Sequence, residues 1–101
     1  MGKKKVLSEV AINELPIPKE NEVLGIAEKL LGNDRIKVKC QDGNTRICRI
    51  RGTMKRKIWI RLNDIVLISL WDFQTETRGD IVWRYKDNQV DWLKKRGYLK
   101  L

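Results

Sequence analysis

Hydrophobic and polar residues alternate along the middle of the chain in the way that is typical of short β-strands. Between residues 35 and 40 every second position is apolar and the positions between are basic. This alternation predicts a strand that buries one face and exposes the other. Asp42-Gly43 is a hairpin signal, so residues 45 to 51 are the predicted partner strand. Arg46 and Ile47 break the alternation there, which predicts a bulge or a position at the rim of the sheet.

Three more segments have the length and composition of strands. They cover residues 22 to 31, 65 to 70 and 81 to 85, and polar or turn-forming segments separate them. Gly25 lies inside the first segment, where a missing side chain lets a strand bend or another backbone approach. The run from 65 to 70 is apolar on both faces, as expected for a central strand of a barrel.

The segment after residue 86 has the signals of a short helix. Asp87 or Asn88 is the predicted N-cap, the bases at 94–96 suit the negative end of the helix dipole, and Gly97 ends the helix. Five short strands followed by one helix predict an all-β fold, a five-stranded OB-fold Greek-key barrel with a C-terminal α-helix. An SH3-like barrel is the alternative.

The chain of 101 residues has room for one domain. We expect residues 1–20 to form a flexible basic N-terminal tail, because three lysines open a stretch without periodicity that ends in two prolines. Residues 21–86 are the predicted OB-fold (S1-like) barrel. Residues 87–101 are the predicted C-terminal helix and tail, packed on the barrel.

Positive charge is concentrated in one part of the chain. The window from Arg35 to Arg61 holds ten Lys and Arg residues and a single acidic residue, Asp42, whereas the rest of the chain holds twelve of each sign. This window therefore accounts for the whole net charge of +9. Clustered cations with an aromatic side chain among them are typical of surfaces that bind nucleic acid.

Strand alternation places much of this charge on one face. Arg35, Lys37 and Lys39 share a face of their strand, and the hairpin brings Arg49 and Arg51 onto a neighbouring strand of the same sheet. Like charges on adjacent strands destabilise a sheet, so we expect an external anion to offset the repulsion. In OB-folds this face and its adjoining loops bind oligonucleotides.

A basic loop or short helical turn is predicted at residues 53 to 60. Lys55, Arg56 and Lys57 precede Trp59, and this basic flank favours a ring that stacks on a nucleotide base over a ring buried in the core. The other tryptophans lack such a flank and are predicted to lie in the core or to cover it: Trp71, Trp83 and Trp92.

Composition argues against several other functions. The chain has no histidine, no nucleophile motif and no phosphate-binding glycine loop, so we do not expect an enzyme. Two cysteines without histidine do not make a four-ligand zinc site, so neither a metal nor another cofactor is predicted. Cys40 and Cys48 are predicted to be buried thiols without a disulfide. No apolar stretch approaches the roughly 20 residues of a membrane span, so we expect a cytoplasmic monomer without membrane contact.

Several short motifs resemble one known family. In chain order they are LGNDRI from Leu31, CQDG from Cys40, RICRIRG from Arg46, KIWI from Lys57 and DIVL from Asp64. Their residues and spacing, from about Glu22 to Gly97, closely resemble translation initiation factor 1A. The long acidic C-terminal tail of eukaryotic members is absent and the basic N-terminal tail is reduced to three lysines, so the chain resembles the archaeal type.

The resemblance implies an OB barrel that binds small-subunit rRNA at the decoding A site of the ribosome during initiation. It also implies that the protein promotes initiator tRNA recruitment, blocks premature A-site entry and works with other initiation factors. The family's rRNA-contacting bases fall on Arg35, Arg46, Lys55 and Arg56, and its stacking or groove-inserting tryptophan falls on Trp59. The full set of predicted RNA-binding residues is Arg35, Lys37, Lys39, Arg46, Arg49, Arg51, Lys55, Arg56, Lys57 and Trp59.

Two other interpretations use the same basic patch. A free single-stranded RNA-binding OB protein of the cold-shock or S1 type would carry several aromatic residues on its binding face, whereas only Trp59 is so placed here. An OB-fold interaction module would use the patch to bind an acidic protein. The three interpretations differ in whether small subunits, free RNA or a protein bind most tightly.

Overall fold

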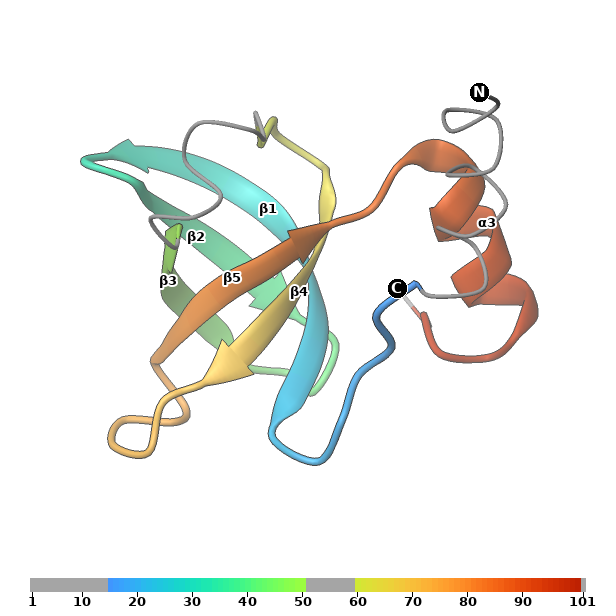
Figure 1. Cartoon of the computed structure of the whole chain (residues 1–101). Helices are drawn as coiled ribbons and strands as arrows, with labels where there is room; N and C mark the ends of the chain where they lie inside the picture. The colour runs from blue at the N-terminus through green and yellow to red at the C-terminus, as the bar shows by residue number, and fades with distance from the viewer. Residues whose placement is uncertain (1–14, 51–59, 101) are drawn as a thin grey trace, which may run out of the picture.

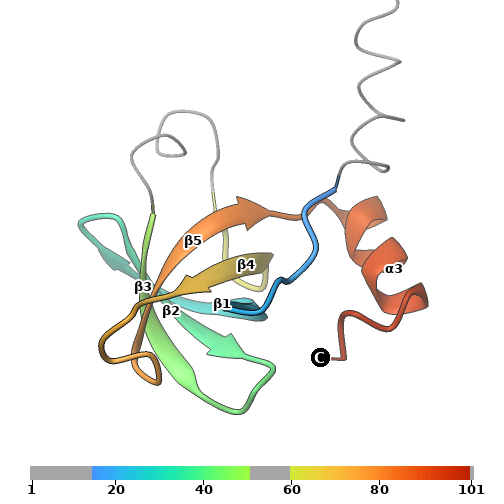
Figure 2. The same ribbon diagram turned by 60° about the horizontal axis from the view of Figure 1, so that its bottom comes forward.

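The computed structural model describes residues 15–50 and 60–100, which form a closed five-stranded barrel with a helix beside it (Figure 1). The elements follow one another as β1 (Glu22–Gly32), β2 (Arg35–Cys40), β3 (Thr45–Ile50), β4 (Ile65–Leu70), β5 (Arg78–Arg84) and α3 (Asp87–Lys95). Figure 2 shows α3 beside the barrel, joined to it by the chain that leaves β5.

The strands close in the order β1-β2-β3-β5-β4, and β4 pairs back onto β1. Neighbouring strands run antiparallel except β3 and β5, which are parallel. A five-stranded Greek-key barrel of this kind is an OB-fold. The predicted fold class is therefore confirmed, and the SH3-like alternative is set aside.

Most predicted strand boundaries agree with the structure. β2 and β4 have the predicted bounds, and β1 is one residue longer than predicted. The largest difference is in β5, which begins at Arg78 rather than at Ile81 because residues 78–81 pair in parallel with β3. Gly79 and Asp80 have low strand propensity, so the local sequence does not indicate this pairing.

The pairing of β2 with β3 keeps one register throughout, so the bulge predicted at Arg46 and Ile47 is wrong. Arg46 is buried and Ile47 is only partly buried, which reverses the expected polarity without changing the register. The register shifts of the barrel lie in β1 and between β4 and β5 instead. Such irregularities let strands bend as the barrel closes.

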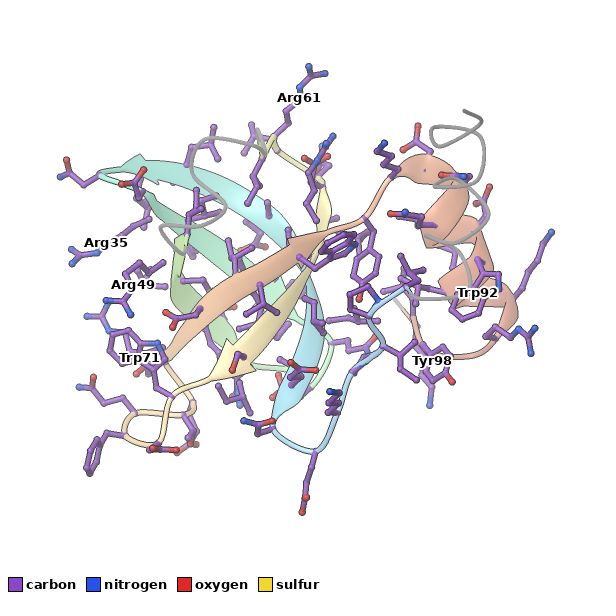
Figure 3. All side chains as sticks on the ribbon, viewed as in Figure 1. Arg35, Arg49, Arg61, Trp71, Trp92 and Tyr98 are labelled. Carbon is purple, nitrogen blue, oxygen red and sulfur yellow. The ribbon has the colours of Figure 1, made fainter. Side chains whose placement is uncertain are left out.

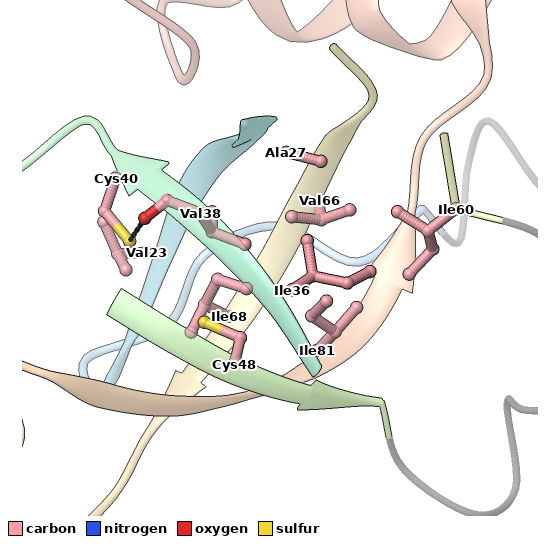
Figure 4. Close-up of a cluster of buried hydrophobic side chains, with 10 residues drawn as sticks. All are labelled: Val23, Ala27, Ile36, Val38, Cys40, Cys48, Ile60, Val66, Ile68 and Ile81. Carbon is pink, nitrogen blue, oxygen red and sulfur yellow. Dashed lines mark hydrogen bonds between the residues drawn. The ribbon is translucent and has the colours of Figure 1, made fainter. Parts of the chain in front are cut away.

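The interior of the barrel is one apolar cluster (Figure 4). Its ten buried side chains are Val23, Ala27, Ile36, Val38, Cys40, Cys48, Ile60, Val66, Ile68 and Ile81. Two glycines let the barrel walls approach closely: a Cβ on Gly25 would lie 2.5 Å from Val38 Cγ1, and one on Gly79 would lie 2.4 Å from Ile68 Cγ2. A larger residue at either position would push the packed walls apart.

A second apolar cluster lies outside the barrel wall, against α3. Leu24 of β1 and Leu67 of β4 are 0% and 1% exposed, although neighbouring residues of both strands point into the barrel. Leu93 of α3 is also 0% exposed and packs in this second cluster, together with Leu99. The helix and the segment after it therefore cover the outer face of β1 and β4.

The segment before β1 belongs to the second cluster as well. Leu15 is 6% exposed within it, and the Tyr85 hydroxyl donates a hydrogen bond to the carbonyl of Pro16. Burial raises the pKa of Tyr85. The predicted tail of residues 1–20 is therefore too long, because its last part is packed; residues 1–14 lie outside the described residues.

The ends of α3 are set by local signals. Lys86, and not the predicted Asp87 or Asn88, occupies the N-cap position, and its backbone N–H donates to Gln89 Oε1 at 2.9 Å. Gly97 ends the helix as predicted, with a φ of 81° that favours glycine. Within the described part of the chain, no helix is long and apolar enough to span a membrane.

Candidate nucleic-acid interface

The outer face of the β2–β3 hairpin carries four exposed cations. Arg35, Lys37 and Lys39 are exposed at every second position of β2, and Arg49 is exposed on β3 directly opposite Arg35. The register therefore confirms the prediction that these side chains share one face. We refer to Arg35, Lys37, Lys39 and Arg49 as the basic face.

Arg49 is held in position by two neighbours. Its Nε lies 3.3 Å from Asp80 Oδ1, and its guanidinium carbon lies 5.4 Å from the centre of the Trp71 ring (Figure 3). The indole N–H of Trp71 donates to the same oxygen, Asp80 Oδ1, at 2.9 Å. Asp80 lies on β5 beside Arg49, so the parallel pairing of β3 with β5 creates this contact. Arg49 remains 56% exposed, so its position is fixed while it stays open to a ligand.

Trp71 does not lie where it was predicted, in the core or covering it. Its ring is partly buried beneath Arg49 at the edge of the basic face. Phe73, in the same loop, is 83% exposed, and the two rings line one hollow of about 500 Å³ together with Arg49. Trp83 and Trp92 pack against the second cluster, as predicted. The signal for Trp71 is not local, because it depends on which strand β5 pairs with.

Arg46 is buried, with 2% of its side chain exposed. Its guanidinium donates two hydrogen bonds to the Asp42 carboxylate, at 3.1 and 2.9 Å, and a third to the carbonyl of Thr75. The bond from Arg46 lowers the pKa of the Asp42 carboxyl. The resemblance implied that Arg46 contacts rRNA, but this guanidinium is directed into the protein because the β2–β3 turn supplies a carboxylate partner.

These bonds connect three separate parts of the chain. Asp42 lies in the β2–β3 turn, and Thr75 lies in the loop between β4 and β5, so Arg46 joins the two. Gln41 extends the connection, because its side chain donates to and accepts from the backbone of residues 98 and 100, at 2.9 and 3.1 Å. The β2–β3 turn is thus bonded both to the β4–β5 loop, which carries Trp71 and Phe73, and to the segment after α3.

The two cysteines are free and buried, as predicted. Burial raises the pKa of both thiols, that of Cys48 to about 12. Both side chains are therefore protonated at neutral pH and belong to the apolar interior, because a thiolate is the reactive and metal-binding form. Among residues 15–50 and 60–100, no three His, Cys, Asp or Glu side chains form a group that could hold a metal ion.

Part of the predicted site lies outside the described residues. This part comprises Arg51, Lys55, Arg56, Lys57 and Trp59. Arg61, just after it, is exposed near the top of the barrel in Figure 3, on the end of the chain that leaves this segment. Its backbone N–H donates to the Asp64 carboxylate at 2.7 Å, and the same carboxylate accepts from Arg84 at 2.8 Å, which partly neutralises Arg84.

The family model and the curated relatives agree on one family. The family model for translation initiation factor 1A / IF-1 matches residues 12–100. The chain is 48% identical over 99 residues to translation initiation factor 1A of Methanopyrus kandleri, covering 98% of this chain and 86% of that protein. It is 50% identical over 86 residues to the factor of Archaeoglobus fulgidus, covering 85% and 88%. The solution structure of translation initiation factor IF-1 from the Wolbachia endosymbiont of Brugia malayi matches with a TM-score of 0.52 and 32% identity, over 65% of this chain and 78% of that one.

Proposed function

This chain belongs to the translation initiation factor 1A / IF-1 family, and from that premise we propose that it binds small-subunit rRNA at the decoding A site. There it promotes recruitment of initiator tRNA and blocks premature entry into the A site. It acts in the cytoplasm as a monomer, alongside the initiator tRNA complex and other initiation factors. It binds without catalysing a reaction.

The observation that carries this proposal is the basic face. Four exposed cations lie on two adjacent strands, and Arg35 and Arg49 stand directly opposite each other. Like charges in cross-strand positions destabilise a sheet, so the arrangement favours a bound polyanion. The strands concerned are those with which OB-folds bind oligonucleotides.

RNA fits this face better than an acidic protein does. The guanidinium of Arg49 lies over the Trp71 ring, and Phe73 is exposed in the same loop. A basic surface with aromatic rings beside it suits single-stranded RNA and unpaired loops, because cations hold the phosphates and rings stack on bases. An acidic peptide offers the charge but not the stacking surfaces.

A binding comparison tests the proposal. We expect tight binding to isolated small ribosomal subunits and weak, non-selective binding to free RNA oligonucleotides, measured by filter binding at one salt concentration. Equal affinity for both would indicate a free single-stranded RNA-binding protein instead. Footprinting of the rRNA with the bound protein should protect nucleotides of the decoding site.

Salt dependence gives a second measurement. If the bound protein contacts about six phosphates, its affinity should fall on the order of 10³-fold between about 50 and 200 mM salt, since each contact releases counterions. A flat salt dependence would exclude binding dominated by phosphate contacts.

Trp59 provides a third test, although it lies outside the described residues. We expect Trp59→Ala to weaken subunit binding and to leave the melting temperature nearly unchanged, because a stacking ring contributes about 1–3 kcal/mol to binding and little to folding. A large fall in melting temperature would place this ring in the core.

A further inference from the structure

A small hollow lies between the ends of β2, β3 and β5 and the loop that precedes β5. Arg35, Arg49 and Arg78 line it, together with Trp71 and Gln74. Its volume is about 210 Å³, below the roughly 300–1,000 Å³ of sites that enclose a whole small-molecule ligand. The hollow therefore suits one small chemical group of a larger ligand.

Strand pairing explains why three arginines meet at this point. Arg35 stands opposite Arg49 in the antiparallel pairing of β2 with β3. Arg78 stands beside Ile47 in the parallel pairing of β3 with β5, two residues before the position beside Arg49. Period 2 places Arg49 and Arg78 on the same side of the sheet, since Gly79 between Arg78 and Asp80 is buried.

The charge of the hollow is strongly positive. None of the described residues that line it is acidic. Asp80, beside Arg49 across the sheet, is already shared between Arg49 and the Trp71 indole. Three guanidinium groups beside this one carboxylate leave a net positive charge, which an anion in the hollow would offset.

We propose that this hollow binds a single phosphodiester group of the bound RNA, with Arg35, Arg49 and Arg78 as its ligands. The inference rests on the proposed function and adds Arg78 to its contacts. A planar guanidinium donates two parallel hydrogen bonds to phosphate oxygens, which an ammonium group does not. Arg78 lies outside the basic window of the sequence, and it reaches the site only through the pairing of β5 with β3.

The salt slope of binding tests whether the three arginines share one phosphate. Binding to isolated small ribosomal subunits is measured at several salt concentrations for Arg78→Gln, Arg35→Gln and the double variant. We expect Arg78→Gln to lower the affinity roughly tenfold. The slope should fall by about 0.7 to 0.9, the range for the loss of one phosphate contact on single strands and on duplex DNA. The double variant should lower the slope no further, because the same phosphate is lost.

Arg96→Gln is the matched control. Arg96 also lies 5.4 Å from a tryptophan ring centre, that of Trp92, and it is the C-cap residue of α3. Figure 3 shows Trp92 on the opposite side of the molecule from Arg49 and Trp71. Its removal should leave both affinity and slope unchanged. Arg78→Lys keeps the positive charge but loses the two parallel N–H donors of the guanidinium. The affinity of this variant should therefore lie between those of the wild type and Arg78→Gln. Wild-type chemical shifts for the indole N–H groups of Trp83 and Trp92, which pack in the second cluster, confirm that each variant is folded.

Inorganic phosphate provides a probe that does not depend on RNA. Titration at constant ionic strength, balanced with chloride, should shift the indole N–H resonance of Trp71 in a saturable way. The resonance of Trp92 should not move, and the shift should disappear in Arg78→Gln. If chloride produces the same shift of Trp71, the hollow does not select phosphate and the proposal is overturned.

The two proposals fail in different ways. If the wild type binds small subunits but Arg78→Gln keeps its affinity and slope, the phosphate site is wrong and the proposed function stands. If the wild type does not bind small subunits, the proposed function is wrong, and so is assignment of the hollow to RNA. If a polyglutamate peptide binds as tightly as the small subunits and competes for the Trp71 shift, the face binds an acidic protein instead.

Discussion

The barrel has two outer faces that the chain treats in opposite ways. On β1 and β4 the outward positions are apolar, and Leu24 and Leu67 are completely covered by α3 and its neighbours. On β2 and β3 the outward positions are mostly basic and stay exposed. Figure 1 shows the consequence, because α3 stands on the β1–β4 side of the barrel and leaves the β2–β3 hairpin free.

The two faces differ in the residues that point outward, between the inward residues of each strand. Every strand contributes inward residues to the same apolar interior, so the interior does not distinguish the two faces. The outward residues determine what covers each face. An apolar outer face is stabilised when a helix buries it, and a basic outer face is stabilised when a bound anion offsets its repulsion. The first face contributes to stability, and we expect the second to contribute to binding.

The largest expected effect is the loss of the covered face. Leu93→Ala should lower the free energy of unfolding by about 2–5 kcal/mol, because it removes a side chain that is 0% exposed between α3 and the barrel. Chemical denaturation measures the change. Lys95→Ala, on the exposed side of the same helix, should change it little. A Leu93→Ala protein as stable as the wild type would show that the helix contributes nothing to the fold.

The open face should respond in the opposite way. Replacement of both Arg35 and Arg49 by Gln should reduce affinity for small subunits roughly a hundredfold, or about 2.7 kcal/mol. The melting temperature should change little, because the variant removes the repulsion between Arg35 and Arg49 but also the exposed contacts of Arg49 with Asp80 and Trp71. Filter binding and thermal denaturation together make the comparison. A protein that loses stability but keeps its affinity would reverse the roles of the two faces.

Arg46 tests the boundary between structural and binding cations. Arg46→Met should lower the free energy of unfolding by about 2 kcal/mol, because the Thr75 carbonyl and the Asp42 carboxylate lose the hydrogen bonds that the guanidinium donates. The salt slope of rRNA binding should stay unchanged, since no phosphate contact is lost. A fall in slope of about 0.9 with unchanged stability would instead make Arg46 an RNA contact, as the family resemblance implied.

Sequence reasoning succeeded where the signal was local. The exposed and buried positions of β2 follow from period 2 alone, so Arg35, Lys37 and Lys39 were placed correctly. The contact of Arg49 with Trp71 and Asp80 depends on β5 pairing in parallel with β3, and no local pattern indicates which strands pair in a closed barrel. A correct prediction of the fold class was therefore not enough to place Trp71 beside Arg49.

Arg46 shows a different limit. Its position in β3 breaks the alternation, which predicts a bulge or a rim position, whereas the structure shows a buried ion pair. A carboxylate in the preceding turn, at Asp42, was the signal that could have decided between them, because a hairpin brings residues on either side of its turn together. The Thr75 carbonyl, 29 residues away along the chain, carried no such signal.

The smallest expected effect is the pH dependence of stability that comes from the ion pair between Arg46 and Asp42. Asp42 follows Gln41, whose side chain bonds to the segment after α3. The bond from Arg46 holds the pKa of Asp42 below its usual value in the folded protein, so the folded state binds fewer protons there than the unfolded state. The stability from this pair is fully present above the usual pKa of about 3.9 and is lost as the pH falls through the lowered folded pKa. Asp42→Asn should therefore be less stable than the wild type at pH 6, with the difference shrinking toward pH 3, as measured by denaturation midpoints across this range. In an Arg46→Met background the same substitution should show a smaller pH dependence, because the largest cause of the lowered pKa is gone and the hydrogen bond from the Asn44 backbone N–H remains; a pH dependence as large as in the wild-type background would assign the effect to Asn44.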